Sequence, residues 1–170
     1  MGLINSNTIY IKLAAMLLIF YVEVCSAQPI IPQRVITVTP SQNLDFGLFF
    51  DGTGSGGTIS IDWQGNRTTT GGIVGLPSYP GNPALFEIKL CQGRNVTITY
   101  APTAILTASN GENLTLDVGP TEKGENGAIF AIENNCNFIT ILRVGGTLHI
   151  PPNATAAVYT GTFEISFNQQ

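Results

Sequence analysis

Alternation of apolar and polar residues with a period of two is the feature of this chain that most limits its fold. It is clearest near the C-terminus, where one parity carries Tyr159, Gly161, Phe163, Ile165 and Phe167. The positions between them carry Thr160, Thr162, Glu164, Ser166 and Asn168. Because successive side chains of a β-strand point to opposite faces, this pattern predicts a strand with one buried face.

The same alternation recurs along the chain between turn signals. Shorter alternating runs lie at residues 44–50, 59–63, 95–100 and 113–118. The glycine-rich residues 51–57 predict a loop, and the pairs Asn110-Gly111 and Gly145-Gly146 predict two-residue hairpins. We find no helical stripe of ten or more residues. The pattern predicts an all-β chain folded as an antiparallel β-sandwich of about nine short strands.

The N-terminus predicts export. Residues 13–22 form an apolar run of ten residues that directly follows Lys12. The run is too short to span a bilayer, but it suits the core of a signal peptide. Small residues at Cys25 and Ala27 place the cleavage after Ala27. We therefore expect a signal peptide at residues 1–27 and one domain at 28–170, found in the periplasm and then at the cell surface or outside the cell.

Two cysteines, Cys91 and Cys136, follow the predicted cleavage site. An even number of cysteines in an exported protein usually forms disulfides, so we predict a bond between these two. Closing a loop of this length would stabilise the fold by roughly 4 kcal/mol in the chain-entropy model.

Composition excludes several classes of function. Charged residues make up 11% of the chain and hydrophobic residues 44%, which is unlike a disordered chain. The net charge of -4 argues against binding to nucleic acid, because phosphate backbones require clustered Lys and Arg. The chain has a single histidine, His149, and no motif with the spacing of metal ligands. We therefore predict no metal, no cofactor and no nucleic-acid partner.

The candidates for chemistry are few. The segment DGTGSGGT (51–58) lacks the lysine of a phosphate-binding loop and is predicted to be a turn. His149 lies between Leu148 and Ile150 on a predicted strand and should face solvent. The chain has four neighbouring acidic residues whose spacing does not fit a calcium loop: Glu112, Asp117, Glu122 and Glu125. We therefore do not predict an enzyme.

Three aromatic residues support an alternative function. Trp63, Tyr79 and Tyr100 would serve as a platform for sugar rings if they lay together on the surface. The corresponding hypothesis is a monomeric secreted or surface module that binds glycans. Packing within the core or across strands is the other interpretation of the same residues.

Several phrases of the sequence together carry a family resemblance. They are LDFG (44–47), GGTISID (56–62), NPALFEI (82–88) and RVGGTLHIPPNATAAVYTGTFEISF (143–167). The chain resembles the exported bacterial family called domain of unknown function 4402. It is also similar to chaperone–usher pilins and spore-coat-U-like subunits, whose chains end in a comparable strand. The resemblance implies an immunoglobulin-like sandwich that serves as a non-catalytic subunit of a fimbria, pilus or other surface appendage.

A sandwich that lacks one strand would explain such a function physically. Its open edge exposes backbone donors and acceptors beside an apolar groove, and a strand from another chain can fill it. We predict that this strand-acceptor groove is lined by Tyr159, Phe163, Ile165 and Phe167. The expected partners are other copies or related subunits, with a periplasmic chaperone and an outer-membrane usher.

The donor strand is predicted in the N-terminal segment. Ile36 and Val38 alternate there with polar residues, and they are the candidate donor side chains within residues 28–40. Pro29 and Pro32 disfavour regular pairing before residue 34. The alternative is that residues 34–39 form the first strand of their own domain, and the sequence leaves both possibilities open.

Overall fold

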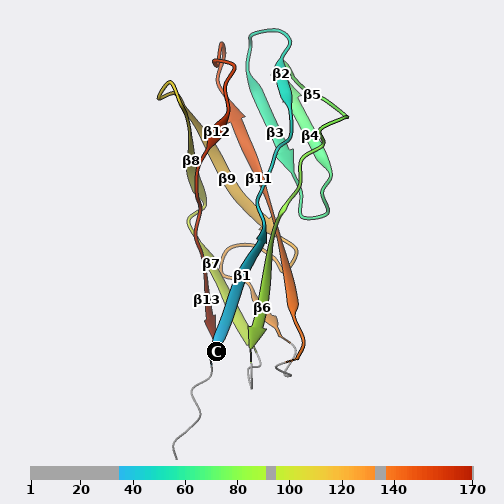
Figure 1. The fold of residues 1–170 in the computed structure, drawn as a ribbon, viewed down its shortest axis with the longest axis vertical. Coiled ribbons are helices and arrows are strands. Elements are labelled where there is room, and N and C mark those ends of the chain that lie inside the picture. Colours follow the sequence, from blue (N-terminus) through green and yellow to red (C-terminus); the bar gives the residue numbers. More distant parts are fainter. Residues whose placement is uncertain (1–34, 91–94, 133–136, 170) are drawn as a thin grey trace, which may run out of the picture. The chain divides into compact units, whose positions relative to one another are not determined.

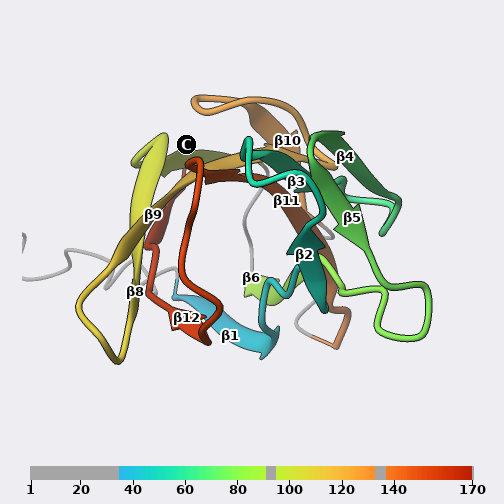
Figure 2. The ribbon, with the colours of Figure 1, turned by 90° about the horizontal axis from the view of Figure 1, so that it is seen from above.

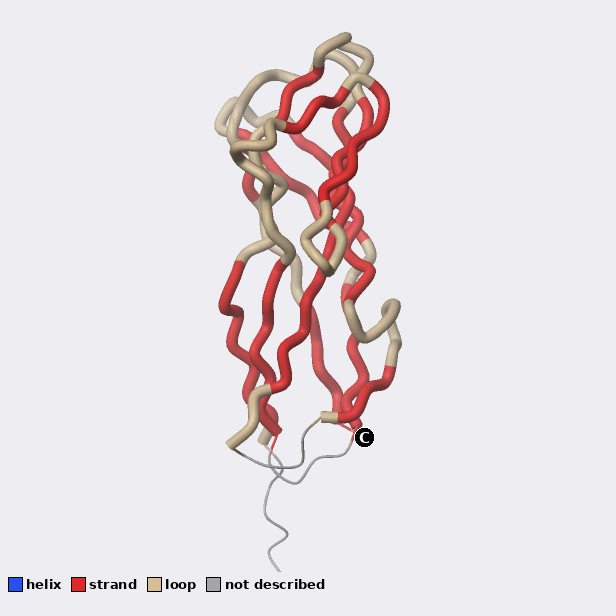
Figure 3. The backbone as a smooth tube through the Cα atoms, turned by 90° about the vertical axis from the view of Figure 1, so that its right-hand side faces the viewer, coloured by secondary structure: helices blue, strands red, loops and turns tan. Residues whose placement is uncertain are grey.

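A computed structural model describes residues 35–90, 95–132 and 137–169 of the chain. Residues 34–170 form one compact unit. The described residues contain strands and no helix, as Figure 3 shows, which confirms the predicted all-β fold. All strand pairs are antiparallel, consistent with the predicted β-sandwich. The predicted signal peptide (1–27) and both cysteines, Cys91 and Cys136, lie outside the described residues.

The strands follow one another along the chain with short connections. They are β1 (Ile36–Gln42), β2 (Phe49–Asp51), β3 (Gly57–Ile61), β4 (Arg67–Gly71), β5 (Ile73–Gly75), β6 (Ala84–Leu90), β7 (Asn95–Tyr100), β8 (Thr103–Ala108), β9 (Asn113–Thr121), β10 (Ile129–Ala131), β11 (Thr140–Ile150), β12 (Tyr159–Thr160) and β13 (Ile165–Gln169). In the part of the chain that the structure describes, no helix is long and apolar enough to cross a membrane.

One large sheet and two small ones make up the domain (Figure 1). The large sheet has the strand order β1-β6-β11-β9-β8-β12, and β3 and β4 extend it beside β11. The second sheet has the order β10-β7-β13, and β2 pairs with β5 in the third. The long strand β11 holds the large sheet together, because its first half pairs with β6, its second half with β3, and its other edge with β9.

The predicted hairpin at Gly145-Gly146 is wrong, because both glycines lie inside β11. A Cβ atom at Gly145 would collide with the carbonyl oxygen of Ile61, and one at Gly146 would lie 2.9 Å from a methyl carbon of Leu44. The register of β11 against β9 also shifts at this point. A glycine inside a strand is typical of such bulges and close approaches, so here it serves packing and not a turn.

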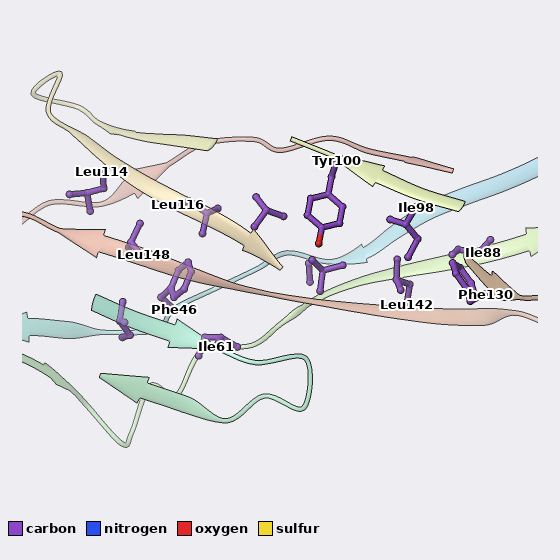
Figure 4. Packing of buried hydrophobic residues seen from close by; sticks show 14 of the residues in the cluster. Phe46, Ile61, Ile88, Ile98, Tyr100, Leu114, Leu116, Phe130, Leu142 and Leu148 are labelled. Carbon is purple, nitrogen blue, oxygen red and sulfur yellow. The ribbon is translucent and has the colours of Figure 1, made fainter. Parts of the chain in front are cut away.

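The hydrophobic core lies between the large sheet and the β10-β7-β13 sheet. Many of its side chains come from the inward parity that the alternation at residues 59–63, 95–100 and 113–118 predicted. Figure 4 shows part of the cluster, including Ile98 of β7 and Leu142 of β11, both completely buried. The other completely buried side chains are Ile59, Ile88, Leu90, Val96 and Val144.

The large sheet curls, so that its two end strands approach each other. Figure 2 shows both end strands, β1 and β12, on the same side of the domain. β12 pairs with β8 of the large sheet, and β13 pairs with β7 of the second sheet. Among the described residues, β1 pairs with β6 alone and β13 with β7 alone. In the described part of the chain, the outer edge of β1 and the outer edge of the last strand therefore have no strand paired to them.

The last alternating run does not form one continuous strand. β12 ends at Thr160 and β13 begins at Ile165. The break matches a break in the partner, because β7 ends at Tyr100 and β8 begins at Thr103. Pro102 lies in that gap and has no N–H to give to a ladder. The final segment thus pairs with two sheets in turn.

Candidate functional site

The open side of the domain gathers all four residues predicted to line the strand-acceptor groove. Tyr159, Phe163, Ile165 and Phe167 are half-buried and pack against the core. The intervening residues of this segment are exposed. We call the space between β1 and the segment 159–169 the seam. The predicted alternation therefore holds, but its apolar face is covered only in part.

The other side of the seam is β1, which contains the predicted donor residues Ile36 and Val38. Ile36 lies opposite Leu90 of β6, and Val38 lies opposite Ile88. Both side chains are half-buried against the core. In the structure, this segment therefore forms the first strand of its own domain, which is one of the two possibilities that the sequence left open.

Phe86 joins the two sides of the seam, and the sequence analysis did not single it out. Its ring lies 6.4 Å from that of Phe163 at an interplanar angle of 73°, and 6.3 Å from that of Phe167 at 55°. Aromatic contacts of this kind contribute about 0.5–1.5 kcal/mol each beyond simple burial. Phe86 lies in β6 opposite Pro40 of β1. Its same-parity neighbours, Ala84 and Ile88, were the available signal that it faces inward.

The backbone of β13 directs hydrogen-bonding groups away from β7 and toward the seam. Ile98 of β7 donates its N–H to the carbonyl of Ala128 (3.0 Å), and its own carbonyl accepts the N–H of Gly127 (2.8 Å). Ile98 therefore cannot bond Phe167, which lies directly opposite it in β13. In an antiparallel pair, the N–H and C=O of one residue point to the same side. Those of Phe167 consequently point away from β7.

The same argument applies to Ile165. Its partner Tyr100 exchanges two hydrogen bonds of 3.0 Å with the side-chain amide of Asn126, on the other side of β7. The N–H and C=O of Ile165 are therefore also directed into the seam. The residues of β13 that turn apolar side chains inward are the same ones that offer backbone groups to an incoming strand.

β1 offers a less complete edge. It contains Pro40, and proline is tolerated in an edge strand where its nitrogen faces away from the neighbouring strand. Since backbone direction alternates along a strand, Val38 and Ile36 then direct their N–H and C=O groups outward as well. The ladder shifts register after Pro40. Both edges of the seam therefore carry backbone groups, but the edge along β13 is not interrupted by a proline.

The end of β13 holds a polar atom in unusual surroundings. The side-chain nitrogen of Gln169, Nε2, is buried and has no hydrogen-bond partner among the described residues. Gln169 continues the half-buried parity of Phe163, Ile165 and Phe167. An unpaired buried donor of this kind costs about 1–3 kcal/mol.

The glycine-rich loop is a turn, as predicted. The carboxylate of Asp51 accepts hydrogen bonds from the backbone N–H groups of Thr53 (3.0 Å), Gly54 (2.8 Å) and Gly56 (2.7 Å). The bond from Gly56 is the main reason that the pKa of Asp51 lies below its usual value. These N–H groups already bond the carboxylate of Asp51, so they are not available to bind a phosphate.

The other polar candidates are dispersed. Glu122 pairs with Arg143 (2.8 Å), and Asp117 pairs with His149 (2.6 Å), which is exposed as predicted. Glu112 accepts the N–H of Thr155 at 3.2 Å. Across residues 35–90, 95–132 and 137–169, no three side chains of the metal-ligating types come together.

The three aromatic residues considered for sugar binding do not share one environment. Tyr100 is buried in the core, Trp63 is half-buried, and Tyr79 is exposed. Tyr100 is therefore not available to stack on a sugar ring. The seam is the site that the described residues support best.

Comparison with known proteins adds one finding. A family model described as Domain of unknown function (DUF4402) matches residues 36–168. No curated protein and no solved structure matches the chain.

Proposed function

The chain belongs to the DUF4402 family, and on this premise we propose that it is an exported, non-catalytic structural subunit of a fimbria or other surface appendage. Subunits are joined by β-strand complementation, in which a strand of one subunit fills the seam of the next. The observation that carries the proposal is the seam itself. Two strand edges run along it, and half-buried apolar side chains line it.

The seam has both properties that strand addition requires. Main-chain groups at Ile165 and Phe167 provide hydrogen bonds of low sequence specificity. The apolar lining provides the larger part of the energy, because burying one or two aliphatic side chains of a donor contributes about 1.5–6 kcal/mol before ordering costs. An open edge of this kind also favours aggregation. In this proposal a periplasmic chaperone occupies the seam before assembly and prevents aggregation, and an outer-membrane usher then receives the subunit.

The donor in this proposal is the N-terminal segment of a neighbouring copy or related subunit. Ile36 and Val38 pair with β6 within the domain, so the donor lies in the residues that lead into β1, from position 28 onward. Ile30 and Ile31 are its apolar side chains, and Pro29 and Pro32 limit the number of its N–H donors. This segment is covalently attached at one end of the seam, since β1 begins there.

Deletion of the donor tests the proposal. Mature chain (28–170) should run as a ladder of oligomers in detergent without boiling, and deletion of residues 28–34 should leave monomers with an intact β1. A synthetic peptide of residues 28–38 should then bind the deleted domain, as measured by fluorescence anisotropy. A full-length chain that remains monomeric at all concentrations would refute the proposal, and ladders that survive the deletion would refute this donor.

A substitution in the seam provides the complementary test. Phe167→Asp places a charge among apolar side chains and should abolish peptide binding, whereas Asn168→Asp places the same charge on the exposed face of β13. Circular dichroism would establish that both variants are folded. Equal loss of peptide binding in the two variants would show that the lining of the seam is not what binds the donor.

A further inference from the structure

Exposed apolar side chains gather at one end of the domain, on the small β2–β5 sheet. Phe50 lies directly opposite Val74 in this sheet. Their side chains are 51% and 47% exposed. Leu48 precedes Phe50 by two residues, has the same parity and is exposed to the same degree. We call Leu48, Phe50 and Val74 the β2–β5 patch.

A second set of exposed apolar side chains lies where β1 and β11 begin. Val35 directly precedes β1, and Phe138 and Ile139 directly precede β11. All three side chains are exposed, Phe138 to 56%. The two strand starts lie within two residues of one level, because Ile36 of β1 lies opposite Leu90 of β6 and Thr140 of β11 lies opposite Ile88. We call Val35, Phe138 and Ile139 the terminal patch.

The two patches lie at opposite ends of β11. Its first residue follows the terminal patch directly, and its last residue, Ile150, lies opposite Gly57. Gly56 and Gly52 are linked to the β2–β5 sheet through hydrogen bonds with Gly72 (2.8 and 2.9 Å). Eleven residues of strand separate the two levels, which corresponds to about 35 Å. Figure 1 shows β2 and β5 at one end, and the chain end of β13 at the other.

We propose that the β2–β5 patch of one copy docks on the terminal patch of the next copy, so that subunits stack end to end. The inference rests on the proposed function, because it follows from the direction in which a donor strand must enter the seam. Its occupant is a second copy of this chain. Exposed apolar clusters at both ends of a domain are typical of surfaces that are covered on association.

The direction of the donor follows from the strands of the seam. Each antiparallel pair reverses the strand direction, so β1 and β12, at the two ends of the order β1-β6-β11-β9-β8-β12, run in opposite directions. The chain continues from β12 into β13, so β1 and β13 also run in opposite directions. An inserted strand is therefore antiparallel to one of them and parallel to the other. Antiparallel pairing is the more stable of the two. It is expected along β13, because Pro40 and the register shift interrupt the edge of β1.

This direction fixes which ends meet. A donor antiparallel to β13 runs toward the end of the domain that holds the β2–β5 patch, so its C-terminal end is the one nearer to that patch. The same end of the donor continues into Val35 of the copy that donates it. The terminal patch of the donating copy therefore faces the β2–β5 patch of the accepting copy. Because the two surfaces differ, the contact does not close on itself, and it propagates into a filament.

Cross-linking between copies tests this contact. The variant with Phe50→Cys and Phe138→Cys, assembled into oligomers and treated with a short bismaleimide, should give a ladder that survives boiling. A mixture of the two single variants should give cross-linked dimers but no longer products. The control variant carries Ile105→Cys and Phe138→Cys, because Ile105 is equally exposed but lies on β8, away from the β2–β5 sheet. Unsubstituted chain treated in the same way measures any reaction of the native cysteines.

The outcomes separate this inference from the proposed function. Suppose that unboiled samples show oligomers, but that the Phe50→Cys, Phe138→Cys variant gives no more cross-linked product than the control with Ile105→Cys. This result would overturn the end-to-end contact and leave strand complementation intact. A Phe50→Cys single variant that cross-links to itself would also overturn it, because like ends would then meet. Absence of oligomers altogether would refute the proposed function, and the inference with it.

Discussion

The interior of β7 and the seam face of β13 have the same sequence pattern but different burial. Val96 and Ile98 of β7 are completely buried, whereas Ile165 and Phe167, which belong to the neighbouring strand, are half-buried. β7 has a strand on each side, and β13 has one described neighbour. Alternation therefore reports which face of a strand turns inward, and the number of neighbouring strands decides how completely that face is covered.

Matched truncations in the two strands give the largest expected effect. Ile98→Ala should lower the free energy of unfolding by about 4 kcal/mol, because it removes three buried carbons and leaves a cavity. Ile165→Ala should cost about 1–2 kcal/mol in the monomer, since its side chain is only half-buried. Urea titration followed by the fluorescence of the single tryptophan, Trp63, would measure both.

Filling the seam should reduce this difference. With the peptide of residues 28–38 bound, the cost of Ile165→Ala should rise toward that of Ile98→Ala, because the donor covers the exposed side of Ile165. The cost of Ile98→Ala should stay the same. If the peptide raises both costs equally, or neither, then it does not bind beside Ile165.

A smaller effect is expected where a glycine lets two strands approach. Gly145→Ala places a methyl group against the carbonyl of Ile61 in the middle of the large sheet, and should destabilise the domain by about 1–3 kcal/mol. Gly111→Ala is the control in a peripheral turn, where a Cβ would meet no atom within 4 Å. Its positive φ of 84° costs about 1 kcal/mol. A larger cost at Gly111, measured by the same urea titration, would contradict the close packing at β11.

Much of the fold could be predicted from the sequence, because alternation is a local property. The all-β fold, the inward parity of β13 and the loop at Asp51 were predicted correctly, since each depends on residues close together in the chain. Gly145-Gly146 was misinterpreted, because a hairpin and a close contact between strands both favour glycine. Only the position of Ile61 across the sheet distinguishes them.

The candidate site was predictable in part. Its lining on the last strand followed from parity, but Phe86 did not, because its contacts with Phe163 and Phe167 join residues more than seventy positions apart. The direction of the backbone groups at the seam depends on the bonds that Ile98 makes to the opposite side of β7. Such relations arise from the pairing of strands and leave no local mark in the sequence.

The loop at Asp51 differs from both the core and the seam, because one carboxylate and not apolar packing holds it. The pKa of Asp51 is lowered, chiefly by the hydrogen bond from Gly56, so its folded value lies below the unfolded value near 3.8. Its contribution to stability is therefore present above the unfolded pKa, and it is lost as the pH falls through the folded pKa. Because the carboxylate lies at the surface, this is the smallest effect expected here.

Asp51→Asn isolates that contribution. The amide keeps the shape of the side chain but cannot ionise, so the variant should lose less stability between pH 7 and pH 3 than the native chain loses. The quantity to compare is the change in urea midpoint between the two pH values, measured for each protein. The pKa of Asp62 is also lowered, although burial opposes the shift. Such other acids contribute equally to the acid loss of both proteins, so their contributions cancel in the comparison. An equal acid loss in the two proteins would show that the bonds of Asp51 to its loop do not stabilise the ionised form.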